Sequence, residues 1–244
     1  MAVALVTGAN TGIGYAIAER LLRDGFALGY ATQRRDEKHR EPYERLSELG
    51  RVHWVAGDLS DPAVPERLVA ETVAELGGLD ALVNNAGLST AAPALDLTVE
   101  DFDLTFAVDV RAAFLLSQHA ARAMRDNGGV IVNVTSIHET QPRPDFALYS
   151  AAKAALGMLT RGLALEWAPL GIRVVAVAPG LIATERNVEA NELDERVPLG
   201  RAGRPEEVAS VVSFLLSDEA AYVTGTSWLV DGALNTRPLA DPAS

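Results

Sequence analysis

Short apolar runs alternate with helical patterns along the whole chain. Between the runs, Ile13, Ile17 and Leu21 recur at the spacing of one helix face. A second helical pattern begins after Thr98 and Asp101, which have the spacing of a capping box. Several runs are apolar at every position, as strands buried on both faces of a sheet are. We therefore predict strands at residues 3–6, 26–31, 52–55, 81–83, 130–134, 172–177 and 228–230.

This alternation predicts one domain that spans residues 1–244. We expect a doubly wound, Rossmann-type α/β fold with a seven-stranded parallel sheet and helices on both faces. We find no repeat, low-complexity tract or inter-domain linker in the sequence. Ligands of such folds bind beyond the carboxyl ends of the strands, so motifs that directly follow a strand are the candidates for function.

Composition narrows the classes of function. With 48% hydrophobic and 22% charged residues, the chain has the balance of a folded globular protein. A net charge of −12 disfavours nonspecific binding to nucleic acid or anionic membranes. The lack of cysteine excludes disulfides and thiolate metal sites, and the 4 histidines lack ligand-like spacing. We expect a cytoplasmic protein with a small-molecule substrate, no metal, and no membrane or nucleic-acid partner.

A glycine-rich loop follows the first predicted strand and precedes a predicted helix. Glycines allow a tight turn there, and the free N–H groups at a helix start attract a pyrophosphate. The spacing is Gly-x3-Gly-x-Gly, and an ordinary strand–helix turn remains the alternative. The candidate dinucleotide-binding residues of this loop are Gly8, Asn10, Thr11, Gly12, Ile13 and Gly14.

The loop after the second predicted strand bears on the choice of dinucleotide. An acidic residue there would bind the ribose 2′-hydroxyl of NAD, whereas arginine suits the 2′-phosphate of NADP. Thr32 stands where the acidic residue is expected, and Arg34 and Arg35 follow. This pattern favours NADP(H) over NAD(H), although Asp36 and Glu37 come next and could neutralise the arginines.

Three polar side chains form a candidate catalytic group. Ser136 follows the fifth predicted strand, and Tyr149 and Lys153 are four residues apart in an alanine-rich, helical segment, so they share a face. A nearby ammonium favours the phenolate, which allows a tyrosine to exchange a proton with a carbonyl oxygen near neutral pH. Ser136 could donate a hydrogen bond to that oxygen. A Tyr-x3-Lys pair alone is more often a pair of surface neighbours.

In combination these motifs resemble those of the short-chain dehydrogenase/reductase family, over nearly the whole chain. The resemblance implies hydride transfer between NAD(P) and a secondary alcohol or sugar hemiacetal, interconverted with its carbonyl, in a homotetramer or homodimer. It implies that Tyr149 is the acid/base, that Lys153 polarises it and binds the nicotinamide ribose, and that Ser136 orients the carbonyl. The other matching motifs are Asp58-Leu59, Asn84-Asn85-Ala86-Gly87, Pro179-Gly180 with Thr184, and Val230-Asp231-Gly232.

The same resemblance assigns further cofactor contacts. Asp58 would meet the adenine amine, and Ile182 and Thr184 would hold the carboxamide. The full set of these contacts is Asp58, Leu59, Asn85, Ala86, Gly87, Tyr149, Lys153, Pro179, Gly180, Ile182 and Thr184.

The sequence departs from the family at Asp109, where an asparagine usually holds a water beside the lysine. An ionised carboxylate accepts hydrogen bonds but cannot donate them. Near Lys153 it would stabilise the ammonium and oppose a phenolate. Our hypothesis is that Asp109 still serves catalysis, with a more alkaline optimum for alcohol oxidation. The alternative is a non-catalytic, dinucleotide-sensing protein. Thr11 is a second departure, since many NADP-using members have Arg or Lys there.

Two resemblances bear on the substrate. Residues 136–144 resemble glucose 1-dehydrogenases, so His138 would face sugar hydroxyls, but Ser89 replaces a glutamate of those enzymes. Residues 217–225 resemble 3-oxoacyl carrier-protein reductases, which makes a 3-oxoacyl thioester the alternative substrate. The segment between Gly180 and Val197 is short for the family and is charged from Glu185 to Arg196, which indicates an open site. Its acidic residues would repel an acidic carrier protein.

Overall fold

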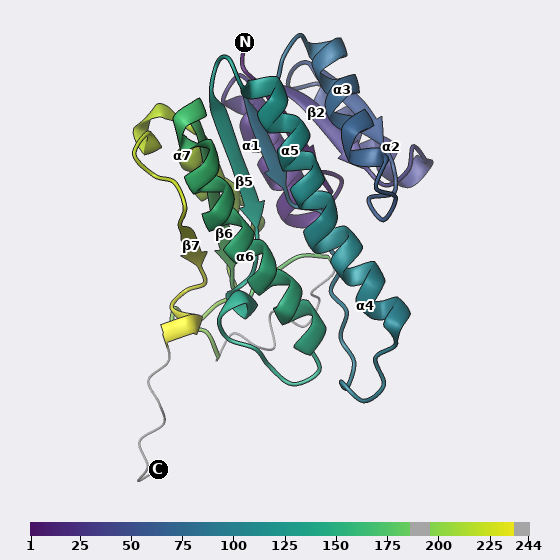
Figure 1. The fold of residues 1–244 in the computed structure, drawn as a ribbon, viewed down its shortest axis with the longest axis vertical. Coiled ribbons are helices and arrows are strands. Elements are labelled where there is room, and N and C mark those ends of the chain that lie inside the picture. Colours follow the sequence, from purple (N-terminus) through teal and green to yellow (C-terminus); the bar gives the residue numbers. More distant parts are fainter. Residues whose placement is uncertain (186–195, 237–244) are drawn as a thin grey trace.

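The computed structural model describes residues 1–185 and 196–236. Seven parallel strands form one sheet in the order β3-β2-β1-β4-β5-β6-β7. The prediction of a Rossmann-type α/β fold with a seven-stranded parallel sheet is confirmed, with strand bounds close to those expected (Figure 1). The strands are β1 (Val3–Thr7), β2 (Ala27–Thr32), β3 (Val52–Ala56), β4 (Ala81–Asn84), β5 (Gly129–Val134), β6 (Ile172–Pro179) and β7 (Ser227–Val230).

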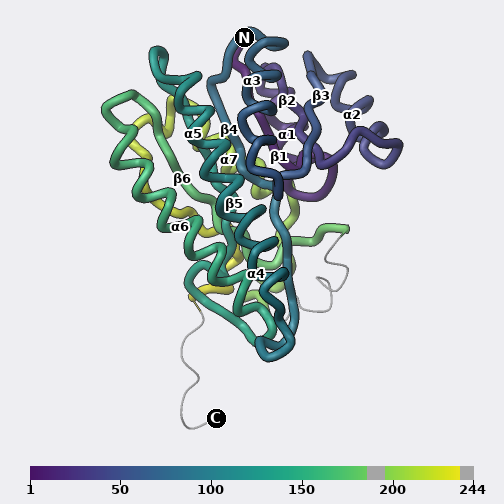
Figure 2. The backbone as a smooth tube through the Cα atoms, turned by 45° about the vertical axis from the view of Figure 1, so that its right-hand side comes forward, coloured from purple at the N-terminus to yellow at the C-terminus, as the bar shows by residue number. Residues whose placement is uncertain are grey.

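Helices connect the strands and cover both faces of the sheet (Figure 2). The α-helices are α1 (Gly12–Arg23), α2 (Glu37–Ser47), α3 (Val64–Leu76), α4 (Val99–Phe106), α5 (Ala112–Met124), α6 (Ala147–Trp167) and α7 (Pro205–Leu216). Shorter helical turns are η1 (Ala107–Arg111), η2 (Ile137–Glu139), η3 (Ala168–Leu170), η5 (Asp218–Ala220) and η6 (Leu234–Thr236). Among the described residues, no helix combines the length and the apolar character needed to cross a membrane.

The sheet separates two hydrophobic cores. Side chains alternate across each strand, so Val6 faces the core beneath α1 and α7, and Leu5 faces the core beneath α3 and α5. All five residues of β1 are buried. This burial on both faces explains why the strand is apolar at every position apart from its last residue, Thr7.

The strand order reverses beside β1, whose neighbours are β2 on one side and β4 on the other. Connections on the two sides of this point run to opposite faces of the sheet, which leaves a crevice at the carboxyl ends of the strands. The arrows of β5 and β7 in Figure 1 point toward this end of the molecule.

The helix predicted after Thr98 is present, and its capping box is formed. The Thr98 Oγ1 accepts the Asp101 N–H at 3.1 Å, and the Asp101 carboxylate accepts the Thr98 N–H at 3.0 Å. Between α4 and α5 the helix widens into a π-helical turn, η1. Such turns often occur at functional sites, and this one carries Asp109.

Candidate active site

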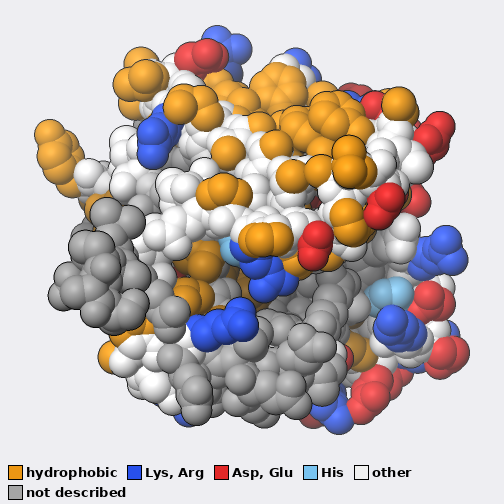
Figure 3. All heavy atoms as spheres, turned by 90° about the horizontal axis from the view of Figure 1, so that it is seen from below, with side chains coloured by type: hydrophobic (Ala, Val, Ile, Leu, Met, Phe, Trp, Pro, Cys, Tyr) orange, Lys and Arg blue, Asp and Glu red, His pale blue; other side chains and the backbone are white. Residues whose placement is uncertain are grey.

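A cavity of about 650 Å³ opens at the carboxyl ends of the strands. Its lining comes mostly from the loops after β1, β2, β3, β4, β5 and β6 and from the first turns of α1, α2 and α6, so it lies at the switch in strand order. Figure 3 looks onto this end of the molecule, where hydrophobic side chains gather across one half and charged side chains along one flank. Among the described residues, no group of three His, Cys, Asp or Glu is placed to hold a metal.

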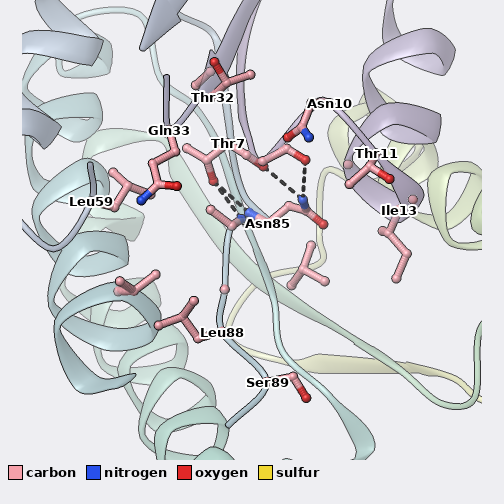
Figure 4. Close-up of a pocket in the computed structure, with 18 of the residues that line it drawn as sticks. Thr7, Asn10, Thr11, Ile13, Thr32, Gln33, Leu59, Asn85, Leu88 and Ser89 are labelled. Carbon is pink, nitrogen blue, oxygen red and sulfur yellow. Dashed lines mark hydrogen bonds between the residues drawn. The ribbon is translucent and has the colours of Figure 1, made fainter. Parts of the chain in front are cut away.

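Hydrogen bonds join the glycine loop to the loop after β4 at one wall of this cavity. The Asn85 side-chain amide donates to the carbonyls of Thr7 at 2.9 Å and Gly8 at 3.2 Å (Figure 4). The Thr7 hydroxyl accepts the N–H groups of Asn85 and Ala86, both at 3.0 Å. Asn85 therefore satisfies backbone groups at the strand ends, while it also lines the cavity.

The start of α1 fits a pyrophosphate. Gly8 and Gly12 adopt φ of 64° and 54°, so the loop needs glycine at both positions. The Thr11 side chain does not cap the helix, because its hydroxyl donates to Glu185 at 3.0 Å instead. The first N–H groups of α1 therefore have no side-chain cap, and they lie at the cavity that Gly12 and Gly14 line.

Gly14→Ala should disrupt this loop. An added Cβ would collide with the Gly8 carbonyl oxygen and the Asn85 amide, and neither of these groups is free to move away. Overpacking of this kind costs about 1–3 kcal/mol. We expect that loss of unfolding free energy, measured by urea denaturation, together with weaker dinucleotide binding.

Gly162→Ala is the matched control, because Gly162 lies in α6 with nothing near the position of its Cβ. Alanine in a helix interior is favoured over glycine by up to about 1 kcal/mol, so this variant should be as stable as the parent or more so. Equal effects of the two substitutions would contradict a specific collision at Gly14.

The two arginines of the loop after β2, both predicted to bind the cofactor, have different surroundings. Arg34 lines the cavity. Arg35, although predicted to bind the cofactor, points away: its guanidinium binds Glu71 on α3 at 2.8 Å and the Trp54 carbonyl. Lys38, in the first turn of α2, lines the cavity in its place and was not singled out from the sequence. Its signal was a basic residue one helical turn after the arginines.

The other polar groups of this loop have internal partners. The Thr32 hydroxyl donates to the Arg34 carbonyl at 2.8 Å and accepts from the Trp54 indole at 2.7 Å. Asp36 caps α2 by accepting the His39 N–H at 3.3 Å, and it also pairs with the His39 ring. Among the described residues Asp36 pairs with His39 and forms no ion pair with either arginine, but it lines the same cavity as Arg34.

Asp58, in the loop after β3, lines the cavity as well. Its carboxylate accepts the Ser60 N–H at 2.9 Å and the Gln33 amide at 3.1 Å. These hydrogen bonds, that of Ser60 first, hold the pKa of Asp58 below its usual range, so it stays ionised at neutral pH. Gln33 also lines the cavity and was missed from the sequence.

Most of the predicted cofactor contacts share this one cavity. Those that line it are Gly8, Asn10, Thr11, Gly12, Ile13, Gly14, Thr32, Arg34, Asp58, Leu59, Asn85, Ala86, Gly87, Tyr149, Lys153, Pro179, Gly180, Ile182 and Thr184. Of the charged segment between Gly180 and Val197, from which an open site was predicted, residues 186–195 lie outside the described residues.

The candidate catalytic group lies together in the same cavity. Ser136, Tyr149 and Lys153 all line it, and the Lys153 Nζ is 5.5 Å from the centre of the Tyr149 ring. Lys153 also donates to the Val134 carbonyl at 3.3 Å. The Ser136 Oγ accepts the His138 N–H at 3.2 Å, so the serine can still donate its own proton to a ligand.

Asp109 stands behind Lys153 and does not line the cavity. One of its oxygens lies 3.1 Å from the Lys153 Nζ, and the other accepts the Leu88 N–H at 2.7 Å. Burial alone would lower the pKa of Lys153, but the Asp109 charge and the nearby Tyr149 raise it above the ordinary value. Lys153 is therefore held as an ammonium ion.

His138 lies beside the catalytic group but outside the lining of the cavity. Its ring is 6.0 Å from the Tyr149 ring, in an edge-to-face arrangement. The Nδ1 is 2.7 Å from the Gln141 carbonyl, which can only accept, so we assign the ring proton to Nδ1. Burial lowers the pKa of His138 more than the hydrogen bond to Gln141 raises it, and the charge of Arg143 lowers it as well. The ring is therefore kept neutral, which leaves Nε2 as an acceptor.

Similarity to known proteins extends over nearly the whole chain. A family model described as enoyl-(acyl carrier protein) reductase matches residues 8–235. A glucose 1-dehydrogenase of Gluconobacter oxydans is 38% identical over 241 residues, which are 94% of this chain and 90% of that protein.

Solved structures of related proteins are also similar to this chain over nearly its whole length. An acetoin dehydrogenase from Enterobacter cloacae superposes with a TM-score of 0.91 and 40% identity, over 99% of this chain and 98% of that one. A short-chain dehydrogenase from Burkholderia cenocepacia J2315, in complex with NADP, has a TM-score of 0.90 and 36% identity, over 95% of this chain and 97% of that one. With its glycine loop, serine, tyrosine and lysine in one cavity, the chain belongs to the short-chain dehydrogenase/reductase family of NAD(P)-dependent oxidoreductases, which act on CH–OH groups.

Proposed function

We propose that this protein interconverts a secondary alcohol, or a sugar hemiacetal, and the corresponding carbonyl. The observation that carries the proposal is that Ser136, Tyr149 and Lys153 share one cavity with the glycine loop and Arg34. When bound, a nicotinamide dinucleotide supplies the hydride donor or acceptor at that site.

The chain's own side chains have separate tasks in this reaction. Tyr149 gives its phenol proton to the substrate oxygen in reduction and takes the proton back in oxidation. Ser136 donates a hydrogen bond to the same oxygen and so fixes its position. Lys153 binds the nicotinamide ribose and favours loss of the Tyr149 proton. The start of α1 would bind the pyrophosphate and Asp58 the adenine, since both line the same cavity.

We propose further that the substrate carries a hydroxyl next to its reacting carbon. The His138 Nε2 has no partner among the described residues, and as the acceptor end of a neutral ring it suits a hydroxyl donor beside Tyr149. Glucose and acetoin, after which two relatives are named, both have such a hydroxyl. The second candidate is a 3-oxoacyl thioester, on the resemblance of residues 217–225 to reductases of such substrates. The description of the matching family model also names an acyl thioester substrate, but one that is reduced at a carbon–carbon double bond.

Absorbance of the reduced nicotinamide tests the proposal. The protein is incubated with NADP or NAD and a panel of aldoses, vicinal diols and simple secondary alcohols. The reverse reaction is run with α-hydroxyketones, simple ketones and 3-oxoacyl thioesters. Faster turnover of the hydroxylated members supports the role of His138. Absence of turnover with intact dinucleotide binding would favour the alternative, a dinucleotide-sensing protein.

Arg34 should decide the preference for NADP(H) over NAD(H). A guanidinium that lines the cavity can bind a 2′-phosphate by charge-assisted hydrogen bonds, which contribute about 1.5–3 kcal/mol. We expect Arg34→Ala to weaken NADP binding at least tenfold and to leave NAD binding nearly unchanged. Fluorescence titration of both dinucleotides measures the two dissociation constants.

Arg35→Ala is the control for this prediction, because Arg35 is held by Glu71 outside the cavity. It should leave the ratio of the two dissociation constants unchanged. A larger change in the ratio with Arg35→Ala than with Arg34→Ala would contradict the assignment.

The homotetramer or homodimer, the cytoplasmic location and the lack of membrane or nucleic-acid partners stay predictions from the sequence.

A further inference from the structure

Asp109 and Lys153 form a buried ion pair, with Lys153 on the side of the cavity. Their atoms Oδ2 and Nζ lie 3.1 Å apart, and the two side chains are 0% and 5% exposed. Oδ2 accepts no hydrogen bond within the described part of the chain, so the ammonium is its partner there. Oδ1 accepts the Leu88 N–H at 2.7 Å. The carboxylate is therefore fixed in place, and its charge balances that of Lys153.

This balance changes the charge that Tyr149 experiences. The Lys153 Nζ lies 5.5 Å from the centre of the Tyr149 ring. An unbalanced ammonium at that range strongly favours a phenolate. With Asp109 in contact, the pair is neutral as a whole, and the two charges act on the phenol in opposite directions. Asp109 therefore opposes loss of the Tyr149 proton.

The remaining charged or titratable groups near Tyr149 do not replace this effect. His138, on η2, is kept neutral because burial and Arg143 lower its pKa. Arg143, in the loop before α6, lies 3.7 Å above the Phe146 ring, whose centre is 6.0 Å from that of Tyr149. Arg143 is exposed, so water screens its charge. The Glu139 carboxylate, also on η2, packs against Gly157, two helical turns along α6 from Tyr149. The cation of the buried pair is the charge that the structure places against the phenol ring.

We infer that Asp109 is a positioning residue that keeps Tyr149 in its proton-donating form. Carbonyl reduction then runs at its full rate through neutral and mildly alkaline pH, and alcohol oxidation reaches its full rate only at more alkaline pH. The inference rests on the proposed function. In reduction the carbonyl oxygen gains the Tyr149 proton and the carbonyl carbon gains a hydride; oxidation reverses both transfers. Because one protonation event governs both directions, their pH profiles must move together.

Asp109→Asn tests the inference, since asparagine can still accept the Leu88 N–H while it removes the charge. Phenolate absorbance is titrated with pH in the parent and in the variant. A version of each protein with Tyr149→Phe is subtracted, so that the signal of Tyr149 alone remains. We expect the phenolate in Asp109→Asn to appear about one pH unit lower than in the parent. Asp103→Asn, which removes an exposed carboxylate from α4, should leave the titration unchanged.

The pH dependence of kcat/KM gives the second readout. In Asp109→Asn, the profiles for reduction and oxidation should both shift to lower pH by the amount seen in the titration. A titration that coincides with the parent, or that moves to higher pH, would overturn the inference. If no substrate is turned over, the proposed function fails separately, and the phenolate titration still decides the role of Asp109. Should Asp109→Asn not fold, Asp109→Ser replaces it in the same titration.

Discussion

Tyr149→Phe is expected to lower kcat by about 10²–10⁴-fold, the range that a positioned general acid or base contributes. The substitution removes only the phenol oxygen and its proton. The ring keeps its contacts with His138 and Phe146, whose ring centres each lie 6.0 Å away. Dinucleotide affinity should therefore change by less than about threefold, because the cavity keeps its shape. Steady-state kinetics and fluorescence titration of the dinucleotide measure the two quantities.

Tyr222→Phe is the matched control, since Tyr222 is fully exposed, precedes β7 and does not line the cavity. It should leave both quantities unchanged. Residual activity of Tyr149→Phe within tenfold of the parent would remove Tyr149 from the chemistry. Loss of dinucleotide binding along with activity would instead point to a disrupted cavity, which thermal unfolding in the presence of NADP would reveal.

The strands could be predicted because burial on both faces leaves little freedom in their composition. Within β5, for example, Val130, Ile131 and Val132 alternate between the two cores, so no polar period interrupts the run. The same physics predicts the cavity. Parallel strands end on one edge of the sheet, so motifs that follow β1, β4 and β5 had to meet there.

Side-chain directions in the loops could not be predicted in this way. Arg34 and Arg35 are neighbours in a loop with no period, so nothing in the sequence decides which of them faces the cavity. The structure assigns Arg35 to Glu71, which is 36 positions away in the chain. The place of Lys38 in the cavity lining could not be predicted for a related reason. Its approach to the cavity depends on the angle at which α2 leaves the loop, which the spacing of residues does not contain.

For Asp109, the position could be predicted from the sequence, but one of its contacts could not. A departure from the family motif identified the position, and its proximity to Lys153 was expected. Its bond to the Leu88 N–H depends on the π-helical turn η1, because one additional residue per turn changes where a side chain points. The helical pattern that starts at Thr98 predicts a continuous helix and gives no sign of that turn.

Lys153→Met should destabilise the fold far more than the loss of a surface ion pair would. The Asp109 carboxylate would then be buried with no cation beside it, and breaking a buried pair from one side costs about 3–5 kcal/mol. Because the pKa of Lys153 is raised in the folded state, the contribution of the pair is fully present below the ordinary lysine pKa and is lost only as pH rises through the raised value. Neutral pH is therefore the right condition for the measurement.

Urea denaturation of Lys153→Met, of Lys153→Met combined with Asp109→Leu, and of Arg40→Met separates charge from packing. Arg40→Met breaks the exposed contact with Glu37 and should cost less than about 1 kcal/mol. The double variant removes both buried charges, so it should recover most of the stability that Lys153→Met loses, as paired replacement of buried ions by apolar groups often does. If the double variant is no more stable than Lys153→Met, the loss arises from packing around the lysine stem, and the uncompensated carboxylate is not its cause.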